Sequence, residues 1–523
     1  MSKSRLIFAP HAPIARGFSQ MGSLMSAVLG PEQGVIWNAI GTGKPESLTD
    51  AGVIARRVIE VAGDGENIGA MILRQAAMAM HERYLDGASI TGTLAAAMLE
   101  GAQKLIAAGV NPMLLRRGIE QGVKTACAKM RADALPADSQ TALENIANTA
   151  IRDPELAAVL SEMFDLLGSS GAYVVEEYAA PLIDRAYVEG GRWSARPASR
   201  DLMPPGGADL TLENPLIFVS DDKLERIEQI RPAVEMAVNL PDKPPLLIIA
   251  RELSGEALKT LTINHVRGAI TAAGVMLLSS GEAMREDLED ISMIVGAALA
   301  AQAIGTAPEM AHPSWLGRAR QVIVGRDTIT LISGAGDRAV TARRASELRA
   351  RLRAIREPND QWERLRLRIA RLSGGLGILK IGALTFQERD LKKALAKKAV
   401  RVLETALEGG VLPGGGTAYL NAIAAVESAR HNEESAGLML VAHALRAPLL
   451  QLVHNHGELT PSVVLHDVMR MGGDAGFNVR TGKIGSMREA GLLDSAPILC
   501  AALETAASAA IMAMTTDVVI AGK

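Results

Sequence analysis

Cysteine and aromatic residues are scarce in this 523-residue sequence, which has 2 cysteines and 3% aromatic residues. Cys127 and Cys500 are too few to form a disulfide scaffold, and their apolar surroundings predict buried, unreactive thiols. This cysteine content fits a reducing compartment, so we expect a cytoplasmic protein. The low aromatic content, together with abundant Ala, Leu, Gly and Met, favours closely packed helices over a β-sandwich or β-barrel.

The sequence also lacks an excess of charge of one sign and a long uninterrupted apolar run. Its formal net charge of -3 provides no general electrostatic attraction to nucleic acid or to an anionic membrane. The apolar stretch 498–514 contains Glu504 and is shorter than the roughly 20 residues that a membrane-spanning helix needs. We therefore predict a buried helix there, a solvated helix face at the basic residues 343–356, and neither nucleic acid nor a membrane as a partner.

Hydrophobic residues make up 48% of the sequence, and the chain is too long for a single hydrophobic core. Both ends show helical periodicity, whereas the centre alternates short β-prone runs with helical stretches. Helices are predicted at residues 55–62, 68–83, 90–108, 224–238 and 255–267, with one long basic helix at 341–372, and strands at 173–176, 216–220, 246–250, 275–278 and 321–324. The sequence thus predicts a mainly α fold with an inserted α/β domain.

Short β-prone runs lie at both ends of the chain, at residues 5–8 and 518–520, and another lies at residues 35–37. Isolated strands are unstable in water, so each of these runs needs a partner. We expect the two terminal strands to pair with each other and with the 35–37 segment of a neighbouring subunit. Strand sharing of this kind would join subunits into an oligomer.

Four loops combine glycine with polar or acidic residues, a composition typical of sites where backbone closely approaches phosphate. They are Leu-Gly-Pro-Glu-Gln-Gly at 29–34, Thr-Asp-Ala-Gly at 49–52, Leu-Asp-Gly-Ala-Ser at 85–89 and Pro-Gly-Gly-Gly-Thr at 413–417. An aspartate in such a loop can hold Mg²⁺ on the phosphates. Any one of these loops, taken alone, is explained as well by turns and helix caps.

The order and spacing of the four loops resemble the nucleotide site of group I chaperonins, the GroEL family, and the resemblance continues along nearly the whole chain. The segment AGVNPMLLRRGI at 108–119 resembles the family's AAGMNPMDLKRGI, and PLLIIA with GEAL at 245–258 resembles PLLIIAED…GEAL. Further matches are GGVLPGGG at 409–416 with EGVVAGGG, RAPL at 446–449 with EAPLRQI, GFN at 476–478 with GYNA, and GLLD at 491–494 with GILD.

The resemblance implies a chaperonin fold of three domains. An equatorial domain would comprise residues 1–132 and 409–523, an intermediate hinge domain 133–189 and 375–408, and an apical domain 190–374. In this family, subunits form seven-membered rings, often stacked in pairs, around a cavity for non-native protein. The resemblance therefore implies a homo-oligomeric ring with a polypeptide client, and it leaves the need for a co-chaperonin open.

Ten residues match positions at which the family binds ATP, and one of them, Asp86, matches the position that holds Mg²⁺. They are Gly30, Pro31, Gly52, Asp86, Gly87, Ser89, Gly414, Gly415, Asn478 and Asp494. Two loops depart from the pattern. The family's KDGV reads Asp-Ala-Gly-Val at 50–53, and its GDGTTT reads LDGASI at 85–90, where Ser89 is the one hydroxyl left. Binding of ATP and Mg²⁺ stays open, because retained and altered positions point in opposite directions.

The largest departure is Lys398, in LKKALAKKAV at 391–400, where the family has an aspartate that helps to position the attacking water. A carboxylate accepts a proton or a hydrogen bond from water, whereas an ammonium group only donates. We therefore predict no catalytic residue here and very slow or absent ATP hydrolysis. A shifted helix register that supplies another acid is the alternative. Lys398 itself has two candidate roles, pairing with a phosphate and forming an ion pair with Asp86.

In this family, two apical helices and a nearby extended segment present apolar side chains that capture unfolded protein through the hydrophobic effect. The matching residues are Trp193 and Leu202 in the segment, Arg231 and Val234 on the first helix, and Leu258, Thr262 and Ile263 on the second. This surface is smaller than the family's and includes the cation Arg231, which favours a particular, partly acidic client. A solvated helix face without a client role is the alternative for Arg231.

Three functions fit these observations. The favoured one is a chaperonin-like folding or assembly chaperone whose ATP hydrolysis is lost or strongly impaired, which includes a scaffold dedicated to a single client enzyme complex. The second is a conventional ATP-driven folding chaperonin, and the third is a structural ring or filament without a client. The first two functions differ in whether a carboxylate occupies the catalytic position of the nucleotide site.

Overall fold

The computed structural model describes residues 4–8, 11–31, 34–39, 45–168, 171–188, 190–204, 209–354, 360–373, 375–429 and 434–522. The chain forms two compact units: unit 1 comprises Met1–Asp165 and Leu384–Lys523, and unit 2 comprises Leu166–Ala383. Both ends of the chain thus build unit 1, and unit 2 is inserted between them. The predicted mainly α fold with an inserted α/β domain is confirmed. The division into three domains, with the bounds predicted above, stays a prediction.

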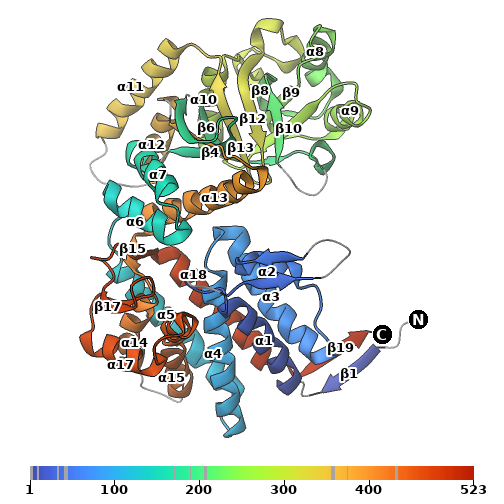
Figure 1. Cartoon of the computed structure of the whole chain (residues 1–523). Coiled ribbons are helices and arrows are strands. Elements are labelled where there is room, and N and C mark those ends of the chain that lie inside the picture. Colours follow the sequence, from blue (N-terminus) through green and yellow to red (C-terminus); the bar gives the residue numbers. More distant parts are fainter. Residues whose placement is uncertain are drawn as a thin grey trace. The chain divides into compact units, whose positions relative to one another are not determined.

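Unit 1 is built of helices around one apolar core (Figure 1). Local signals start several of them: Asn111 accepts a hydrogen bond from the Met113 N–H at the start of α5, and Thr385 accepts one from the Glu388 N–H at the start of α13. The helices are α1 (His11–Ser26), α2 (Ala51–Arg57), α3 (Asp64–Tyr84), α4 (Ala88–Ala107), α5 (Pro112–Asp133), α6 (Gln140–Ile151), α7 (Pro154–Leu167, which runs past the end of the unit's first segment), α13 (Phe386–Gly409), α14 (Thr417–Ser428), α15 (Ser435–Ala444), α16 (Ala447–His456), α17 (Pro461–Met471) and α18 (Ala496–Met514).

The predicted helices of unit 1 are confirmed with one exception. Residues 68–83 lie within α3, and residues 90–107 lie within α4. The prediction of a helix at 55–62 is wrong beyond residue 57, because Val58 takes an extended conformation and a new helix starts after Gly63, whose φ is 94°. The chain between α2 and α3 therefore turns at a glycine, where other residues would be strained.

The helix α18 confirms the predicted buried helix near the end of the chain. By length and composition, Ala496–Met514 and the stretch Ser435–His456 are each apolar enough to cross a membrane, but 61% of each is buried inside the fold. Small side chains on α18 let it pack closely against α4 and α5. Cys127 of α5 and Cys500 of α18 are buried free thiols within this packing, as predicted.

Short strands bring the two ends of the chain together in unit 1 (Figure 1). The strand β1 (Ser4–Phe8) pairs antiparallel with β19 (Val518–Gly522), so the predicted pairing of the terminal strands is confirmed. The strand β2 (Ile36–Asn38) pairs with β3 (Glu46–Leu48) of the same chain. Pairing of these strands with a neighbouring subunit stays a prediction. Two further antiparallel pairs are β15 (Val411–Pro413) with β18 (Leu493–Ser495), which are distant in sequence, and the hairpin β16 (Ala475–Asn478) with β17 (Lys483–Ser486).

Unit 2 contains an eight-stranded mixed sheet in the order β11-β8-β9-β10-β6-β13-β12-β7, in which β8 also pairs with β12. The strands β8, β9, β10 and β11 are parallel, and the other pairings are antiparallel. The strands are β6 (Gly190–Pro197), β7 (Leu210–Glu213), β8 (Leu216–Leu224), β9 (Leu246–Leu253), β10 (Ala272–Leu277), β11 (Leu299–Ala300), β12 (Gly317–Val324) and β13 (Thr328–Gly334). All predicted strands lie in named strands except residue 278, and residues 173–176 belong to a separate small sheet.

Helices cover both faces of this sheet, as the near-continuous apolar runs of its parallel strands require. On β8, Leu216 and Phe218 face α8 (Ile227–Asn239) and α9 (Gly255–Val266). Ile217 and Val219 face the core that includes α10 (Gly281–Val295), α11 (Arg338–Ala354) and α12 (Asp360–Leu372). The predicted long helix 341–372 is thus two helices in the described residues, and the predicted interruption at Pro358 lies outside them. A three-stranded sheet, β4 (Ala172–Glu177)-β14 (Leu376–Ile381)-β5 (Ile183–Val188), completes unit 2.

A buried ionic cluster ties α10 to α12 beneath the large sheet. Arg368 bonds both carboxylate oxygens of Asp290, at 2.6 and 2.9 Å, and also pairs with Glu286. Its neighbour Arg371 pairs with Asp287 at 2.9 Å and covers the ring of Trp193 at 4.8 Å. Arg368 and Asp290 are 3% and 0% exposed, so neither can regain water if its partner is removed.

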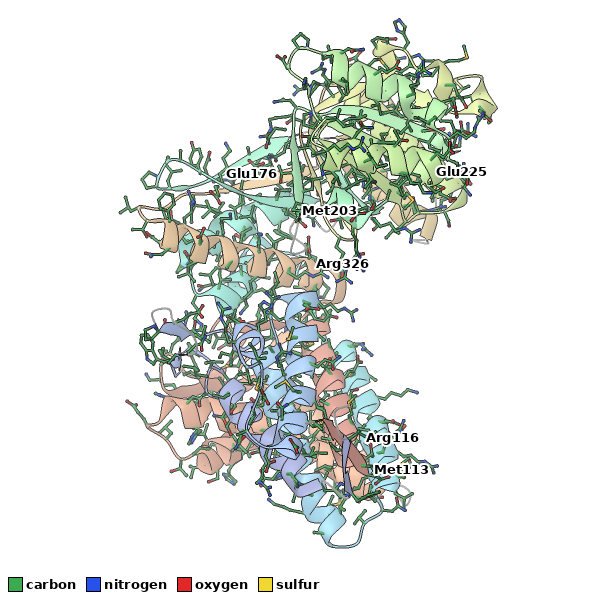
Figure 2. The ribbon with its side chains drawn as sticks, turned by 90° about the vertical axis from the view of Figure 1, so that its right-hand side faces the viewer. Met113, Arg116, Glu176, Met203, Glu225 and Arg326 are labelled. Carbon is green, nitrogen blue, oxygen red and sulfur yellow. The ribbon has the colours of Figure 1, made fainter. Side chains whose placement is uncertain are left out.

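We predict that Arg368→Met destabilises unit 2 by about 3–5 kcal/mol, because it leaves the Asp290 carboxyl buried without its bidentate partner. The double variant Arg368→Met/Asp290→Leu should recover most of this loss, since an apolar pair of similar volume carries no uncompensated charge. Equilibrium urea unfolding followed by circular dichroism measures both. The control is Arg116→Ala, which removes an exposed pair with Glu120 on α5 and should cost less than about 1 kcal/mol (Figure 2). Equal unfolding midpoints for Arg368→Met and the wild type would contradict the account.

Candidate functional site

A cavity of about 330 Å³ lies within unit 1, where the glycine-rich loops meet α6, α13 and β18. Most of the predicted nucleotide-site residues, although far apart in sequence, line this one cavity. They are Gly30, Pro31, Asp86, Gly87, Ser89, Gly415, Asn478 and Asp494, together with Lys398. Gly52 and Gly414 lie outside the lining. The structure therefore brings eight of the ten predicted residues together.

Two helices begin at the wall of this cavity, each after a glycine in the left-handed region. Gly87 precedes α4 with a φ of 81°, and Gly416 precedes α14 with a φ of 82°. A side chain at Gly87 would also meet the methyl end of Met80 at 2.8 Å. The first amide N–H groups of a helix have no acceptor within the helix, and the positive end of its dipole lies there. Both helix starts therefore make this wall favourable for an anion.

Lys398 projects into the cavity from α13 and forms an ion pair there. Its Nζ lies 3.0 Å from Oδ1 of Asp86, the residue that directly precedes the Gly87 turn. Of the two roles open for Lys398, the structure shows the ion pair with Asp86. Both side chains keep some contact with solvent, at 23% and 35% exposure. The carboxylate expected to hold Mg²⁺ thus already has a cationic partner from its own chain.

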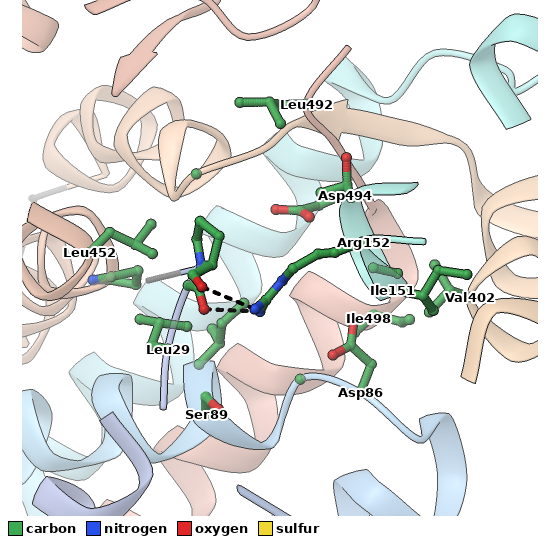
Figure 3. A pocket seen from close by; sticks show the side chains of 18 of the residues that line it. Leu29, Asp86, Ser89, Ile151, Arg152, Val402, Leu452, Leu492, Asp494 and Ile498 are labelled. Carbon is green, nitrogen blue, oxygen red and sulfur yellow. Dashed lines mark hydrogen bonds between the residues drawn. The ribbon is translucent and has the colours of Figure 1, made fainter. Parts of the chain in front are cut away.

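A second cation, Arg152, reaches across the cavity from the end of α6, and sequence reasoning did not identify it. Its guanidinium donates to the carbonyls of Gly30 and Pro31, at 2.9 and 3.2 Å (Figure 3). Burial and the nearby Arg480 lower the pKa of Arg152, and Asp86 acts in the opposite direction. Arg152 is followed by Asp-Pro between two helices, where no glycine pattern marks it as a site residue.

Asp50, the acid displaced by one residue from the family pattern, is engaged in local structure. Its Oδ1 accepts the Val53 N–H at 2.9 Å as the N-cap of α2, and lies 3.4 Å from Nδ1 of His81. Burial lowers the pKa of His81 despite the attraction of Asp50, which favours the neutral imidazole at neutral pH. Gly52 allows this arrangement, because a Cβ there would lie 2.2 Å from His81 Nδ1.

Asp494, on β18, is the third carboxyl group in the cavity lining. Burial raises its pKa to about 7, the negative charge of Asp86 adds to this rise, and Lys398 opposes it. Asp494 is therefore partly protonated at neutral pH and contributes less negative charge than its formula suggests. Apolar side chains lie all around the cavity: Leu29 and Leu452 lie on one side of Arg152, and Ile151, Val402 and Ile498 lie on the other (Figure 3). The cavity lining thus mixes cationic and apolar side chains.

No carboxyl group of α13 lines the cavity in the described part of the chain. The acids of this helix are Glu388, Asp390, Glu404 and Glu408. Glu404 pairs with Arg401 at 3.1 Å, and Lys398 holds the inward position. Within the described residues there is also no group of three or more His, Cys, Asp or Glu side chains that could hold a metal ion. A shifted register of α13 that supplies another acid is therefore not what the structure shows.

Comparison with protein families agrees with this geometry. The model of the TCP-1/cpn60 chaperonin family matches residues 42–164 and 219–523, most of the chain. The chain belongs to the TCP-1/cpn60 chaperonin family. The matched residues include the loops at 49–52, 85–89 and 413–417, and Lys398.

Solved structures show the same fold for this chaperonin. The chaperonin gp146 from bacteriophage EL 2 (Pseudomonas aeruginosa), crystallised in the presence of ATP-BeFx, matches with a TM-score of 0.77 and 18% sequence identity. The match covers 99% of each chain. A second crystal form of the same protein matches with a TM-score of 0.67 over the same share of each chain. The predicted chaperonin fold is confirmed over the full length.

The predicted client-binding residues of the chaperonin need a correction. Trp193 and Leu202 are each 1% exposed, because Trp193 packs beneath Arg371 in the core of unit 2 and Leu202 packs in the core under α8 and α9. Neither can contact a client in this fold, so their prediction as client-binding residues is wrong. Val234 and Leu258 are also half-buried against that core, whereas Ile263 is 48% exposed.

Arg231 lies on the exposed side of α8, as predicted, but it is not a free cation. Its Nε donates to Oε1 of Glu235 at 2.8 Å, one helical turn along. Exposed apolar side chains that the sequence comparison did not single out are Val238 on α8 and Val266 on α9, at 39% and 68%. Val238 lies on the same helix as Arg231, and Val266 lies on the same helix as Ile263, so both would enlarge the exposed apolar surface of these two helices.

The raised pKa of Asp494 predicts a pH-dependent stability that Asp494→Asn removes. The folded state binds this proton more tightly than the unfolded state, so the wild type loses stability as the pH rises from about 3.8 to about 7. Thermal unfolding of both proteins across this range should show the variant gaining several degrees on the wild type, with a constant difference above pH 7. A difference in melting temperature that does not change with pH would contradict the burial of this carboxyl.

Proposed function

We propose that this chaperonin is a folding or assembly chaperone that binds non-native polypeptide and has lost most or all ATP hydrolysis. The observation that carries the proposal is the ion pair between Lys398 Nζ and Asp86 Oδ1 at 3.0 Å. An ammonium group at this point of α13 cannot accept a proton or a hydrogen bond from the attacking water. The same group neutralises the carboxylate that would hold the metal ion.

The residues of the cavity fit a phosphate-bearing ligand better than they fit Mg²⁺. The cavity offers helix N-termini after Gly87 and Gly416, and three cations in its lining, Arg152, Lys398 and Arg480. Its carboxyl groups are each compromised as metal ligands: Asp86 pairs with Lys398, Asp50 caps α2, and the pKa of Asp494 is raised to about 7. Mg²⁺ prefers several free oxygen ligands in regular geometry.

The client surface that we propose is the outer side of α8 and α9. Ile263 and Val266 are exposed there, and Thr262 and Leu258 are half-buried beside them. This apolar surface is small, which favours a narrow range of clients, such as the subunits of one enzyme complex. The pairing of Arg231 with Glu235 balances its charge, so the case for an acidic client is weaker than the sequence alone indicates.

We also propose a homo-oligomeric ring in the cytoplasm, with seven subunits as in the group I chaperonins. The support in this chain is the pair of short sheets in unit 1. Trp37 on β2 is 66% exposed, and Phe8 on β1 and Ile520 on β19 are each 71% exposed. Two-stranded sheets with exposed apolar side chains and open edges are stabilised by a further strand from a neighbour.

Steady-state ATPase measurement tests the loss of hydrolysis. We expect the purified protein, with Mg²⁺ and saturating ATP, to turn over at a rate ~10²–10⁴-fold below that of a conventional group I chaperonin measured alongside it. The variant Asp86→Ala shows whether any residual rate belongs to this site, because contaminating enzymes are unaffected by it. A rate close to that of the conventional chaperonin, abolished by Asp86→Ala, would sink the proposal.

Capture of a denatured client tests the surface on α9. We expect the protein to suppress aggregation of a dilute, chemically unfolded substrate without ATP, and Ile263→Ser/Val266→Ser to lose most of this effect because apolar contact area is lost. A matched control is Met113→Ser, an exposed methionine at the start of α5 in unit 1 (Figure 2). Light scattering follows the aggregation. Equal suppression by both variants would place the client surface elsewhere.

A further inference from the structure

We infer that the cavity of unit 1 binds a nucleoside phosphate as a metal-free anion, with Lys398 supplying the positive charge that a magnesium ion would otherwise bring. The inference rests on the proposed function, because a pocket without a catalytic acid can keep a ligand it does not hydrolyse. In this pocket the ligand is a nucleoside phosphate without a metal ion, and Lys398 takes the place of the metal.

The first step is the contact between Lys398 and Asp86. With Nζ only 3.0 Å from Oδ1, a divalent cation on the same carboxylate would lie close to a fixed ammonium group, and the two cations would repel each other. An ammonium group has three donors, and the contact with Asp86 needs one of them. A phosphate oxygen can therefore share Lys398 with Asp86, whereas Mg²⁺ must displace it.

The second step is the charge balance of the cavity. Three cationic side chains, Lys398, Arg152 and Arg480, line it. They stand against three carboxyl groups, those of Asp50, Asp86 and Asp494. The cations of the chain itself therefore already balance the carboxyl groups of the cavity without any metal ion. Mg²⁺ bound to the anion would cancel part of the anion's charge and so weaken its attraction to Lys398 and Arg152.

The third step is the donor geometry around Arg152. Two of its guanidinium nitrogens each donate to a backbone carbonyl, those of Gly30 and Pro31 (Figure 3). These bonds hold the guanidinium in place and leave further N–H donors of its fork for an oxyanion. Across the cavity, the starts of α4 and α14 present backbone N–H groups. Donors from four separate elements therefore face one space.

The apolar wall decides what the anion is attached to. Ile151, Val402, Leu452 and Ile498 also line the cavity, and Ile498 lies close to the Gly87 turn. A volume of about 330 Å³ exceeds the needs of inorganic phosphate and lies at the lower end of the range for small-molecule sites. An apolar ring joined to a charged phosphate group matches this mixture of apolar and cationic side chains, and a nucleoside phosphate has this composition.

Calorimetric titration of the full-length protein tests the inference, with ADP and ATP each measured in excess EDTA and again in Mg²⁺. We expect binding in EDTA and no tighter binding in Mg²⁺. Inorganic pyrophosphate, titrated in EDTA, should bind at least about tenfold more weakly than ADP, because it lacks the apolar group. Binding that needs Mg²⁺, or no binding of either nucleotide in EDTA up to about 1 mM, would overturn the inference. Equal affinity for pyrophosphate and ADP would overturn the assignment of a nucleoside.

Variants of α13 make the test specific to Lys398. Lys398→Asp should weaken ADP binding in EDTA by at least about tenfold and make the remaining binding depend on Mg²⁺, since charge-assisted hydrogen bonds are replaced by repulsion. Lys397→Asp introduces the same charge change at the exposed neighbouring position and should leave binding unchanged. If Lys398→Asp fails to fold by circular dichroism, Lys398→Met serves, with the same expected loss in EDTA. Unchanged binding in the folded variant would contradict the role of Lys398.

These outcomes separate the inference from the proposed function. Hydrolysis of ATP at a brisk rate, together with binding in EDTA, would sink only the proposed loss of the ATPase. A strict need for Mg²⁺ without turnover would sink only the inference drawn here.

Discussion

One ion pair, Lys398 with Asp86, sets the chemistry of the whole cavity. The pair joins α13 to the turn before α4, so it connects the helix that carries the family's catalytic position to a glycine loop of the nucleotide site. Its positive member offers an attacking water no hydrogen-bond acceptor, which is the basis of the proposed loss of hydrolysis, and its negative member is the carboxylate expected to hold a metal ion. The other features of the cavity, including Arg152 and the raised pKa of Asp494, act around this contact.

The fold explains how such distant residues come to share one space. Both ends of the chain build unit 1, so Asp86 and Asp494, from opposite halves of the sequence, line the same cavity. Asp86 precedes α4 and Asp494 precedes α18, and these two helices pack against each other. The chaperonin fold is kept over the chain, while the loops around the cavity depart from the family's sequence pattern at a few positions. This combination supports the proposal of a chaperone that keeps the fold and has lost hydrolysis.

Much of this could be predicted from sequence, because periodicity and glycine spacing are local signals. The helical ends, the inserted α/β unit and the pairing of the terminal strands followed from them, whereas the position of Lys398 in the cavity came from the resemblance to the chaperonin family. The burial of side chains that depends on distant parts of the chain could not be predicted. The resemblance to the family placed Trp193 and Leu202 on the client surface, yet both pack in the core of unit 2. Arg152 was missed because its role depends on the carbonyls of Gly30 and Pro31, more than a hundred residues away.

The most direct test of the central claim is a cryo-EM map of the protein incubated with ATP and excess Mg²⁺. The account predicts that Lys398 remains within hydrogen-bonding distance of Asp86, that no metal density lies on this carboxylate, and that any bound nucleotide is intact. A magnesium ion on Asp86, with Lys398 turned out of the cavity and a carboxylate aimed at the terminal phosphate, would contradict it.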